Sequence, residues 1–415
     1  MPNRLLLLLA ALLVPVPAWA QPELPVVRAG SRLVTIVDGP HVMKNIWYVM
    51  PEKSPDVYYV EIPRRPHTVT FTTDRESIAF DVSFGSVHRF IVRLEDGREG
   101  LTEIRTEFKT GPVMSRAAGA SPGPPSIPFT LGDNDKIYVD GRLNGGAPLR
   151  LQVDFGAGGT IVKKASVPKA NLTFDATITL RNSDGVNVVP ASSTNELVVH
   201  DLRWRGVHVA QADNMTWRED GIVGNLLFRD KVVEVDYDRM RLTVHDALPD
   251  LPAGAWTREE VFLDGGTVPF IRGRLAVGGA VRDGWFMLDT GAYTSILHSD
   301  LLSPSAKFRQ ELRGLVGAGK GPILHVAGRT FAGTNYSVRL FDGDVSSLGL
   351  LGSDVLKRFN WILDNQQGAA YFRPSVRMAD PWRNPERLVV RAAALLTPLM
   401  AVAAAWLIRR RRRRL

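Results

Sequence analysis

The sequence predicts a mainly β protein in which one β-rich unit occurs twice, preceded by a small β-sandwich and followed by one transmembrane helix. Three observations predict it: short runs with alternating apolar residues, sequence blocks that occur twice in the same order, and apolar segments at both ends of the 415-residue chain. With 45% hydrophobic and 23% charged residues, the composition is typical of a folded globular protein with room for two or three domains.

The N-terminal residues 1–20 have the features of a signal peptide. Arg4 precedes an apolar run that contains Pro15 and Pro17, and the segment ends in the cleavage pattern Ala18-Trp19-Ala20. An uncleaved anchor is the alternative. The two prolines favour cleavage, because they suit a membrane-spanning helix poorly.

The C-terminal end carries a second apolar segment. Residues 388–408 are long enough to span most of a bilayer as a helix, and the arginine-rich tail 409–415 follows directly. Because arginines stay on the cytoplasmic side, the pattern predicts an exported protein anchored in the inner or cytoplasmic membrane, with its domains on the periplasmic or extracellular side. A C-terminal signal that is cut off is the alternative, which retention of Arg409–Arg414 would exclude.

The part of the chain between these segments carries nearly balanced charge. All 43 Asp and Glu lie within residues 21–386, and nine of the 51 Lys and Arg lie outside that range, which leaves 42 inside it. This balance gives no electrostatic support for binding nucleic acid. The absence of cysteine excludes disulfides, and the eight histidines form no His-x-x-x-His pair, so neither a metal nor a cofactor is implied.

Residues 21–111 form the first predicted domain. Runs such as DVYYVEI, HTVTFTT and RFIVRLED alternate at period two and are bounded by turn-forming residues, which favours a small antiparallel β-sandwich. We see no catalytic pattern in them, so a spacer or interaction module is the preferred role. The Gly-, Ala-, Ser- and Pro-rich residues 112–126 are typical of an interdomain linker.

The sequence after the linker is duplicated. GRLNGG precedes LRLQVDFGAGGTIV in the first copy, and GRLAVGG precedes WFMLDTGAYTSIL in the second. Further along, GIVGNLLFRDKVVEVD corresponds to GLLGSDVLKRFNWILD, and each block places an Asp twelve residues after its second Gly. Three blocks in the same order predict two copies of one β-rich unit, at residues 127–248 (lobe 1) and 257–375 (lobe 2).

Alignment of the copies places Asp154 opposite Asp289, each after an apolar strand and within a shared D-x-G-A-x-x-[ST] pattern. The two copies resemble the aspartic peptidases, in which each lobe contributes one D-T-G or D-S-G loop and a later apolar-apolar-Gly strand that braces it. Residues 221–224 and 349–352 are similar to these bracing segments. The resemblance implies two tandem retropepsin-like β-barrel lobes that form a pepsin-like bilobal unit.

The resemblance also implies a membrane-anchored aspartic endopeptidase that acts on a polypeptide substrate. Asp154 and Asp289 are the candidate catalytic residues, since two facing carboxyl groups hold one proton between them and activate a water molecule together. Gly156, Gly291 and Thr290 are the candidate supporting residues. Glycine lets backbone amides approach the carboxylates, and in the family the hydroxyl at the Thr290 position locks the two loops together. The oligomeric state stays open.

Lobe 1 departs from the family pattern at Phe155, which has no hydroxyl and whose bulk could displace the loop. Three interpretations follow. The chain has a working but asymmetric pair of aspartates, its first lobe has decayed to leave a peptide-binding or scaffold protein, or second lobes pair between chains. The covalent linkage of the two copies favours a pair within one chain.

A glycine-rich segment in lobe 2 is the candidate for a mobile flap over the cleft. Gly314, Gly317, Gly319 and Gly321 lie between the Asp289 loop and the second bracing segment. Residues 182–185 form a predicted turn in the corresponding interval of lobe 1, where a plain surface hairpin is an equal alternative. A glycine-rich lid would admit a polypeptide and then exclude water.

Overall fold

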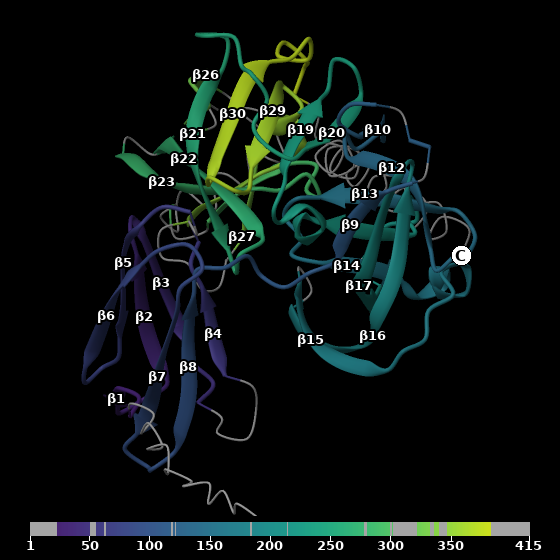
Figure 1. Cartoon of the computed structure of the whole chain (residues 1–415). Helices are drawn as coiled ribbons and strands as arrows, with labels where there is room; N and C mark the ends of the chain where they lie inside the picture. Colours follow the sequence, from purple (N-terminus) through teal and green to yellow (C-terminus); the bar gives the residue numbers. More distant parts are fainter. Residues whose placement is uncertain are drawn as a thin grey trace, which may run out of the picture.

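The computed structural model describes residues 23–49, 55–61, 64–117, 119–120, 122–182, 185–213, 215–277, 280–298, 301, 322–332, 336–339 and 347–382. The predicted signal peptide, the predicted transmembrane segment 388–408 with its tail, and the four flap glycines (Gly314, Gly317, Gly319 and Gly321) lie outside these residues. Within them, no helix is long and apolar enough to cross a membrane. Strands dominate the described chain, which confirms the mainly β prediction (Figure 1).

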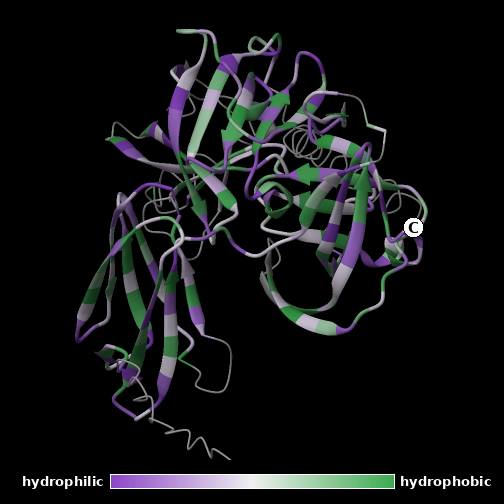
Figure 2. Ribbon diagram, viewed as in Figure 1, coloured by the Kyte–Doolittle hydropathy of each residue, from purple (hydrophilic) through white to green (hydrophobic). Residues whose placement is uncertain are grey.

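The N-terminal domain consists of two four-stranded sheets around one apolar core. Its strands are β1 (Val26–Ala29), β2 (Leu33–Asp38), β3 (His41–Ile46), β4 (Asp56–Tyr59), β5 (His67–Thr72), β6 (Ser77–Val82), β7 (Val87–Leu94) and β8 (Glu99–Arg105). One sheet has the order β1-β7-β8-β4 and the other β3-β2-β5-β6. Apolar and polar residues alternate along these strands (Figure 2), so each sheet turns one face to the core.

The pairing inside this domain differs in part from the antiparallel arrangement that the sequence predicted. β1 pairs with β7 and β4 pairs with β8 in parallel. The reason is that the chain changes sheets between β1 and β2 and again between β3 and β4. Neither β1 nor β4 therefore joins its neighbour through a tight hairpin, which would require an antiparallel pair.

Lobe 1 is built on a nine-stranded sheet. Its elements are β9 (Val113–Arg116), β11 (Thr130–Leu131), β12 (Ile137–Leu143), β13 (Leu149–Asp154), β14 (Thr160–Lys163), η1 (Lys164–Lys169), β15 (Ala176–Asn182), β16 (Gly185–Val199), β17 (Leu202–Ala212), β18 (Gly221–Gly224) and η2 (Asn225–Phe228). The order is β11-β12-β13-β18-β14-β17-β16-β15, with β9 beside β17. Since β9 lies within residues 112–126, part of the predicted linker belongs to this sheet.

Lobe 2 repeats the pairing around the candidate aspartates. Its elements are β21 (Thr257–Asp264), β22 (Val268–Val277), β23 (Ala280–Leu288), β24 (Ser295–His298), β25 (Ile323–Val326), β26 (Arg329–Phe331), β27 (Tyr336–Arg339), β28 (Ser347–Leu351) and α2 (Ser353–Leu356). β23 runs parallel to β28, as β13 runs parallel to β18 in lobe 1. β24 and β14 each pair antiparallel with these bracing strands. The strand that leads to each aspartate therefore pairs with the corresponding bracing strand in both copies.

A continuous sheet joins the two lobes. β10 (Ser126–Pro128), β20 (Arg241–His245) and β19 (Val232–Asp236) of the first copy continue into β29 (Phe359–Asp364), β30 (Ala369–Pro374) and then β21 of the second. At its centre, β19 and β29 pair antiparallel, with Val233 opposite Leu363. These two residues belong to one apolar core that extends through both lobes. The lobes thus meet through equivalent strands, as expected for a pseudo-twofold arrangement (Figure 1).

The N-terminal domain packs against lobe 2 (Figure 1). The imidazole of His41 lies between the rings of Phe262 and Trp285, with ring centroids 3.9 and 4.4 Å apart. At the edge of this contact, Arg65 forms an ion pair with Glu260 at 2.9 Å. The domain is therefore held against lobe 2 by specific side chains as well as by the chain connection.

The burial of His41 predicts a pH dependence of stability. Burial lowers the pKa of His41 from 6.5 to about 4, with Arg272 acting in the same direction and Asp38 in the opposite one. Because this pKa lies below its value in the unfolded chain, neutral His41 gives its full stabilisation above pH 6.5, and the stabilisation is lost as the pH falls toward 4.

We expect the free energy of unfolding to fall between pH 6.5 and 4 by about 3 kcal/mol more in the wild type than in a His41→Leu variant. Urea unfolding at a series of pH values measures both. The variant is the control, since the carboxyl groups that also titrate in this range are the same in the two proteins. Identical pH dependence in the two would contradict the assignment to His41.

Candidate active site

The structure brings Asp154 and Asp289 together where the two lobes meet. Asp154 is the last residue of β13, and Asp289 follows the last residue of β23. Each carboxyl group lies against a glycine of the opposite loop, and the charge of Asp289 raises the pKa of Asp154. Each carboxyl group also accepts a hydrogen bond from its own loop, from the backbone N–H of Gly156 at 2.9 Å and of Ala292 at 2.8 Å. The two aspartates meet within a single chain, so pairing of second lobes between chains is not needed to bring two carboxyl groups together.

The bracing segments hold the two loops in the same way. The N–H of Asn225 donates to the carbonyl oxygen of Ala157 at 3.1 Å, and the N–H of Ser353 donates to that of Ala292 at 2.7 Å. The glycine before each donor has no room for a Cβ, because the backbone of the aspartate loop already occupies that space. This close approach explains why both bracing segments end in glycine.

Gly156 and Gly291 lie against the carboxyl group of the opposite lobe. A Cβ on Gly156 would lie 2.7 Å from Cγ of Asp289, and a Cβ on Gly291 would lie 2.7 Å from Oδ1 of Asp154 and closer still to Oδ2. Real Cβ atoms do not approach other heavy atoms this closely. Glycine is therefore required at both positions for the two carboxyl groups to meet.

Thr290 connects the two loops. Its hydroxyl donates to the carbonyl oxygen of Val153 at 2.8 Å and accepts from the N–H of Phe155 at 3.0 Å. The Phe155 side chain points into the core between the lobes, with its ring centroid 6.2 Å from that of Phe228 and 5.0 Å from that of Trp361. Phe155 therefore leaves Asp154 in contact with Asp289, although only one of the two loops supplies a hydroxyl to the connection.

The surroundings raise the pKa of both aspartates. Burial is the largest cause for each, and the charge of Asp289 adds to the effect on Asp154, whose pKa rises to about 8. The loop N–H groups and the charge of Lys136 act in the opposite direction on both pKa values. Two adjoining carboxyl groups cannot both ionise readily, so the pair holds one proton over the range between its two ionisations.

Two side chains that the sequence did not single out lie beside this pair. Nε2 of Gln152 donates to Oδ2 of Asp154 at 3.5 Å, and Nζ of Lys136 donates to Oε1 of Gln152 at 3.1 Å. The period-two spacing from Asp154 could have identified Gln152, because residues two apart on a strand share a face. Lys136 becomes evident only from the pairing of β12 with β13, which the sequence does not contain.

The repeated aspartates that end the later blocks, Asp236 and Asp364, serve turns. The side chain of Asp236 accepts hydrogen bonds from the backbone N–H groups of Asp238 and Arg239, each at 2.9 Å. In the same way, the side chain of Asp364 accepts from the N–H groups of Gln366 and Gln367, each at 2.9 Å. Both aspartates lie at the ends of the central strands of the connecting sheet. They stabilise equivalent hairpins.

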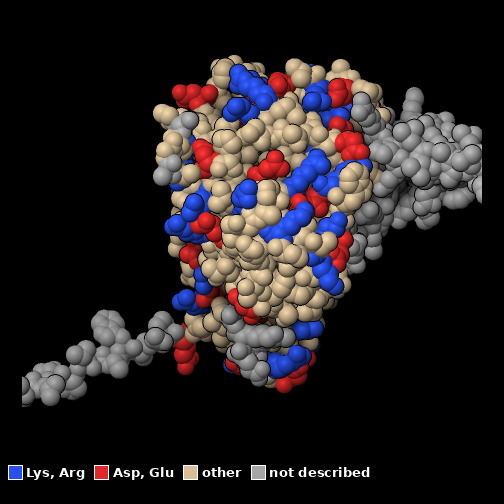
Figure 3. Space-filling model, turned by 90° about the vertical axis from the view of Figure 1, so that its right-hand side faces the viewer, with Lys and Arg blue, Asp and Glu red and all other residues tan. Residues whose placement is uncertain are grey.

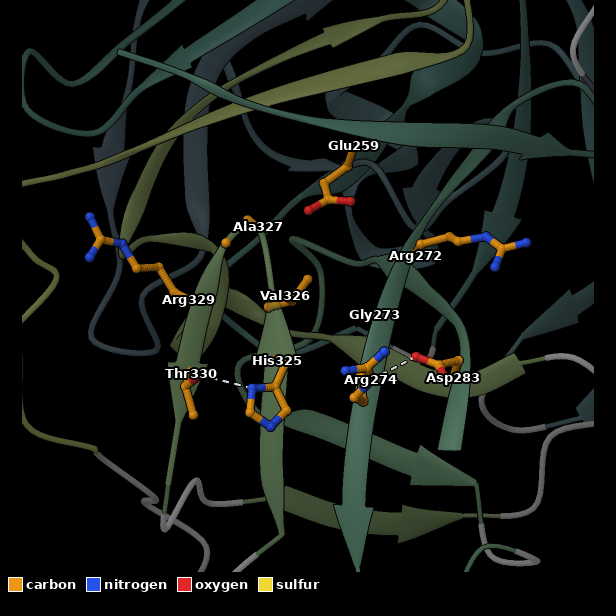
Figure 4. A pocket seen from close by; sticks show the side chains of 11 residues that line it. Glu259, Arg272, Gly273, Arg274, Asp283, His325, Val326, Ala327, Arg329 and Thr330 are labelled. Atoms are coloured by element: carbon orange, nitrogen blue, oxygen red, sulfur yellow. Dashed lines mark hydrogen bonds and ion pairs between the residues drawn. The ribbon is translucent and has the colours of Figure 1, made fainter. Parts of the chain in front are cut away.

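A separate pocket of about 380 Å³ lies on lobe 2, between β21, β22 and the β25–β26 hairpin (Figure 4). Glu259 points into it, whereas Arg274 is paired with Asp283 at 2.8 Å and His325 with Thr330 at 2.8 Å. Its lining residues come from lobe 2 alone. The pocket therefore does not span the junction where the two aspartates meet.

The surface charge agrees with the balanced composition. Basic and acidic side chains are interspersed on the face shown in Figure 3. Among the residues that the structure describes, no group of three or more His, Asp or Glu is arranged to hold a metal ion.

Comparisons with known proteins give a partial likeness. No protein-family model matches the chain, and no curated protein matches it. Among solved structures, the chain is similar to the crystal structure of an aspartic proteinase from Irpex lacteus. The TM-score is 0.44 and the sequence identity 14%, and the match covers 62% of this chain and 99% of that chain.

Proposed function

We propose that this chain is an aspartic endopeptidase, which hydrolyses peptide bonds of a polypeptide with a water molecule activated by Asp154 and Asp289. The observation that carries the proposal is the close approach of these two carboxyl groups at the lobe junction, where each lies against a glycine of the opposite loop. It is supported by the duplicated loops, in which backbone N–H groups orient each carboxylate. Oriented carboxyl groups that share one proton can act as base and acid in the same step.

In the proposed reaction, the ionised carboxyl group takes a proton from water as the water oxygen attacks the carbonyl carbon of the peptide bond. The protonated carboxyl group gives its proton to the carbonyl oxygen, which yields a gem-diol and leaves one proton on the pair. In the second step the pair donates a proton to the amide nitrogen and removes one from a hydroxyl of the gem-diol. The C–N bond breaks, giving a carboxylic acid and an amine, and the pair is restored.

We further propose that the enzyme is anchored in the inner or cytoplasmic membrane by residues 388–408, with its domains on the periplasmic or extracellular side. The support is the apolar segment closed by arginines at 409–414, together with the signal-peptide pattern of residues 1–20. In this arrangement the substrate is an exported polypeptide, and the membrane is the second partner.

Replacing Asp289 with asparagine tests the catalytic proposal. We expect the cleavage rate of an unfolded protein to fall on the order of 10²–10⁴-fold, because asparagine cannot exchange protons with the water or the substrate. Asp250→Asn, in the exposed segment between the lobes, is the matched control and should leave the rate unchanged. Undiminished cleavage by the Asp289→Asn variant would refute the proposal.

A second candidate function, peptide binding without hydrolysis, is favoured by the absence of a hydroxyl at Phe155. The same assay separates the two functions. A binding protein would retain an unfolded polypeptide without shortening it, in the wild type and the Asp289→Asn variant alike.

A further inference from the structure

We propose that Lys136 is a positioning residue for the proton of the Asp154 and Asp289 pair: its ammonium group, held opposite Asp154 through Gln152, stabilises the ionised member. This inference rests on the proposed function and adds a charged residue to it.

β12 and β13 pair antiparallel (Figure 1), and their register, continued to the residue just before β12, places Lys136 beside the pair. Tyr138 lies opposite Gln152 and Asp140 opposite Arg150, so continuing the same register by two residues sets Lys136 opposite Asp154. Residues that face each other in an antiparallel pair point to the same side of the sheet. The hydrogen bonds from Lys136 to Gln152 and from Gln152 to Asp154 follow from this shared face.

The position of Lys136 is fixed from lobe 2. The preceding residue, Asp135, turns the chain into β12 with a φ of 59°. Its carboxylate accepts from Nζ of Lys357 at 2.7 Å, and Lys357 is a buried lysine of lobe 2 that also pairs with Asp380 at 3.3 Å. An ion pair between the lobes thus holds the turn from which Lys136 extends. Arg377 pairs with Asp380 at 3.7 Å, so the two cations and two carboxylates of this cluster balance and leave the charge of Lys136 to act on the aspartates.

The other charged side chains on the sheet face that carries Asp154 interact with residues further from the pair. The guanidinium group of Arg150 lies 4.0 Å from the ring centroid of Tyr138, and the Tyr138 hydroxyl donates to Glu219 at 3.2 Å. Arg150 is four residues before Asp154 on the same strand, roughly 13 Å away at the usual rise per residue. Lys136, by contrast, donates to an uncharged amide next to the pair. Its charge lowers the pKa of both Asp154 and Asp289, against the effect of burial.

The sign of the expected effect follows from this arrangement. A nearby positive charge favours the forms of the pair that have lost one or two protons, so it lowers both macroscopic pKa values. Removing the charge raises both. The range in which the pair holds a single proton therefore moves to higher pH without Lys136.

The test is the pH dependence of kcat/KM for the full chain and three variants. We expect both limbs of the profile to shift to higher pH by about one unit in Lys136→Met. The profile of Lys136→Arg should stay near that of the wild type, because arginine keeps the charge. Arg150→Met removes a positive charge from the same face at a greater distance, and its limbs should move much less. Unchanged limbs in Lys136→Met, a movement to lower pH, or an equal movement in Arg150→Met would overturn the inference.

A second measurement is independent of turnover. The carboxyl groups of the pair can be titrated by carbon NMR in full-length protein labelled at aspartate, with Asp154→Asn and Asp289→Asn identifying the signals. Higher pKa values of the pair in Lys136→Met support the role of Lys136. This holds even if the wild type hydrolyses no peptide, in which case the proposed function alone fails. Equal titration curves in the two proteins refute the role of Lys136.

Discussion

Replacing Gly291 with alanine is expected to reduce kcat for peptide hydrolysis by about 10²-fold or more, since a displacement of about 1 Å at a catalytic group costs that much. The added methyl group would lie 2.7 Å from Oδ1 of Asp154 and closer to Oδ2. The carboxyl group of Asp154 therefore cannot keep its position beside Asp289 unless one loop moves. The expected loss is therefore in catalysis, through the separation of Asp154 from Asp289.

The control for this variant is Gly159→Ala, in the loop that follows Asp154. A Cβ on Gly159 would meet no atom within 4 Å, and its φ lies outside the left-handed region, so the added methyl group fits. We expect the Gly159→Ala variant to have the kcat of the wild type. Urea unfolding of both variants establishes that they are folded. A Gly291→Ala variant as active as Gly159→Ala would show that the contact between the carboxyl groups is not needed.

Replacing Thr290 with valine is expected to lower the free energy of unfolding by about 2–4 kcal/mol, because two buried backbone groups lose their partner. Thr290 is fully buried, and its hydroxyl satisfies the carbonyl oxygen of Val153 and the N–H of Phe155 at once. Valine has nearly the same shape but neither donates nor accepts. Since the two bonds cross from one lobe to the other, we expect the loops to lose their alignment and activity to fall as well.

The chain offers a matched control four residues away. Thr294 is also buried, and within the described residues its hydroxyl has no hydrogen-bond partner. Thr294→Val should therefore leave stability unchanged or raise it, whereas Thr290→Ser should stay close to the wild type because it keeps the hydroxyl. Urea unfolding measures all three. Equal stabilities of Thr290→Val and Thr294→Val would contradict the role given to the Thr290 hydroxyl.

The sequence was sufficient to predict that Asp154 and Asp289 occupy equivalent places in two copies of one unit, because duplication leaves matching blocks in matching order. It also predicted that each aspartate ends a buried strand, since an apolar run precedes both. These features depend on local pattern and repetition, which a single sequence displays directly.

Other features depend on contacts between distant segments, which a single sequence does not display. The place of Lys136 beside Asp154 follows from strand register, and the fit of Phe155 depends on Trp361, some two hundred residues further along the chain. The parallel pairing of β1 with β7 likewise depends on how the chain crosses between sheets. The roles of Gly314, Gly317, Gly319 and Gly321 as a flap and of residues 388–408 as an anchor stay predictions.

The one-sided connection between the aspartate loops has a consequence for how such a chain can change over generations. In a symmetric dimer of identical chains, a substitution that replaced threonine by phenylalanine after the aspartate would appear in both loops and remove both hydroxyls. In this chain each half is encoded separately. Thr290 alone supplies the bond between the loops, so the position of Phe155 can contribute an aromatic ring to the core instead.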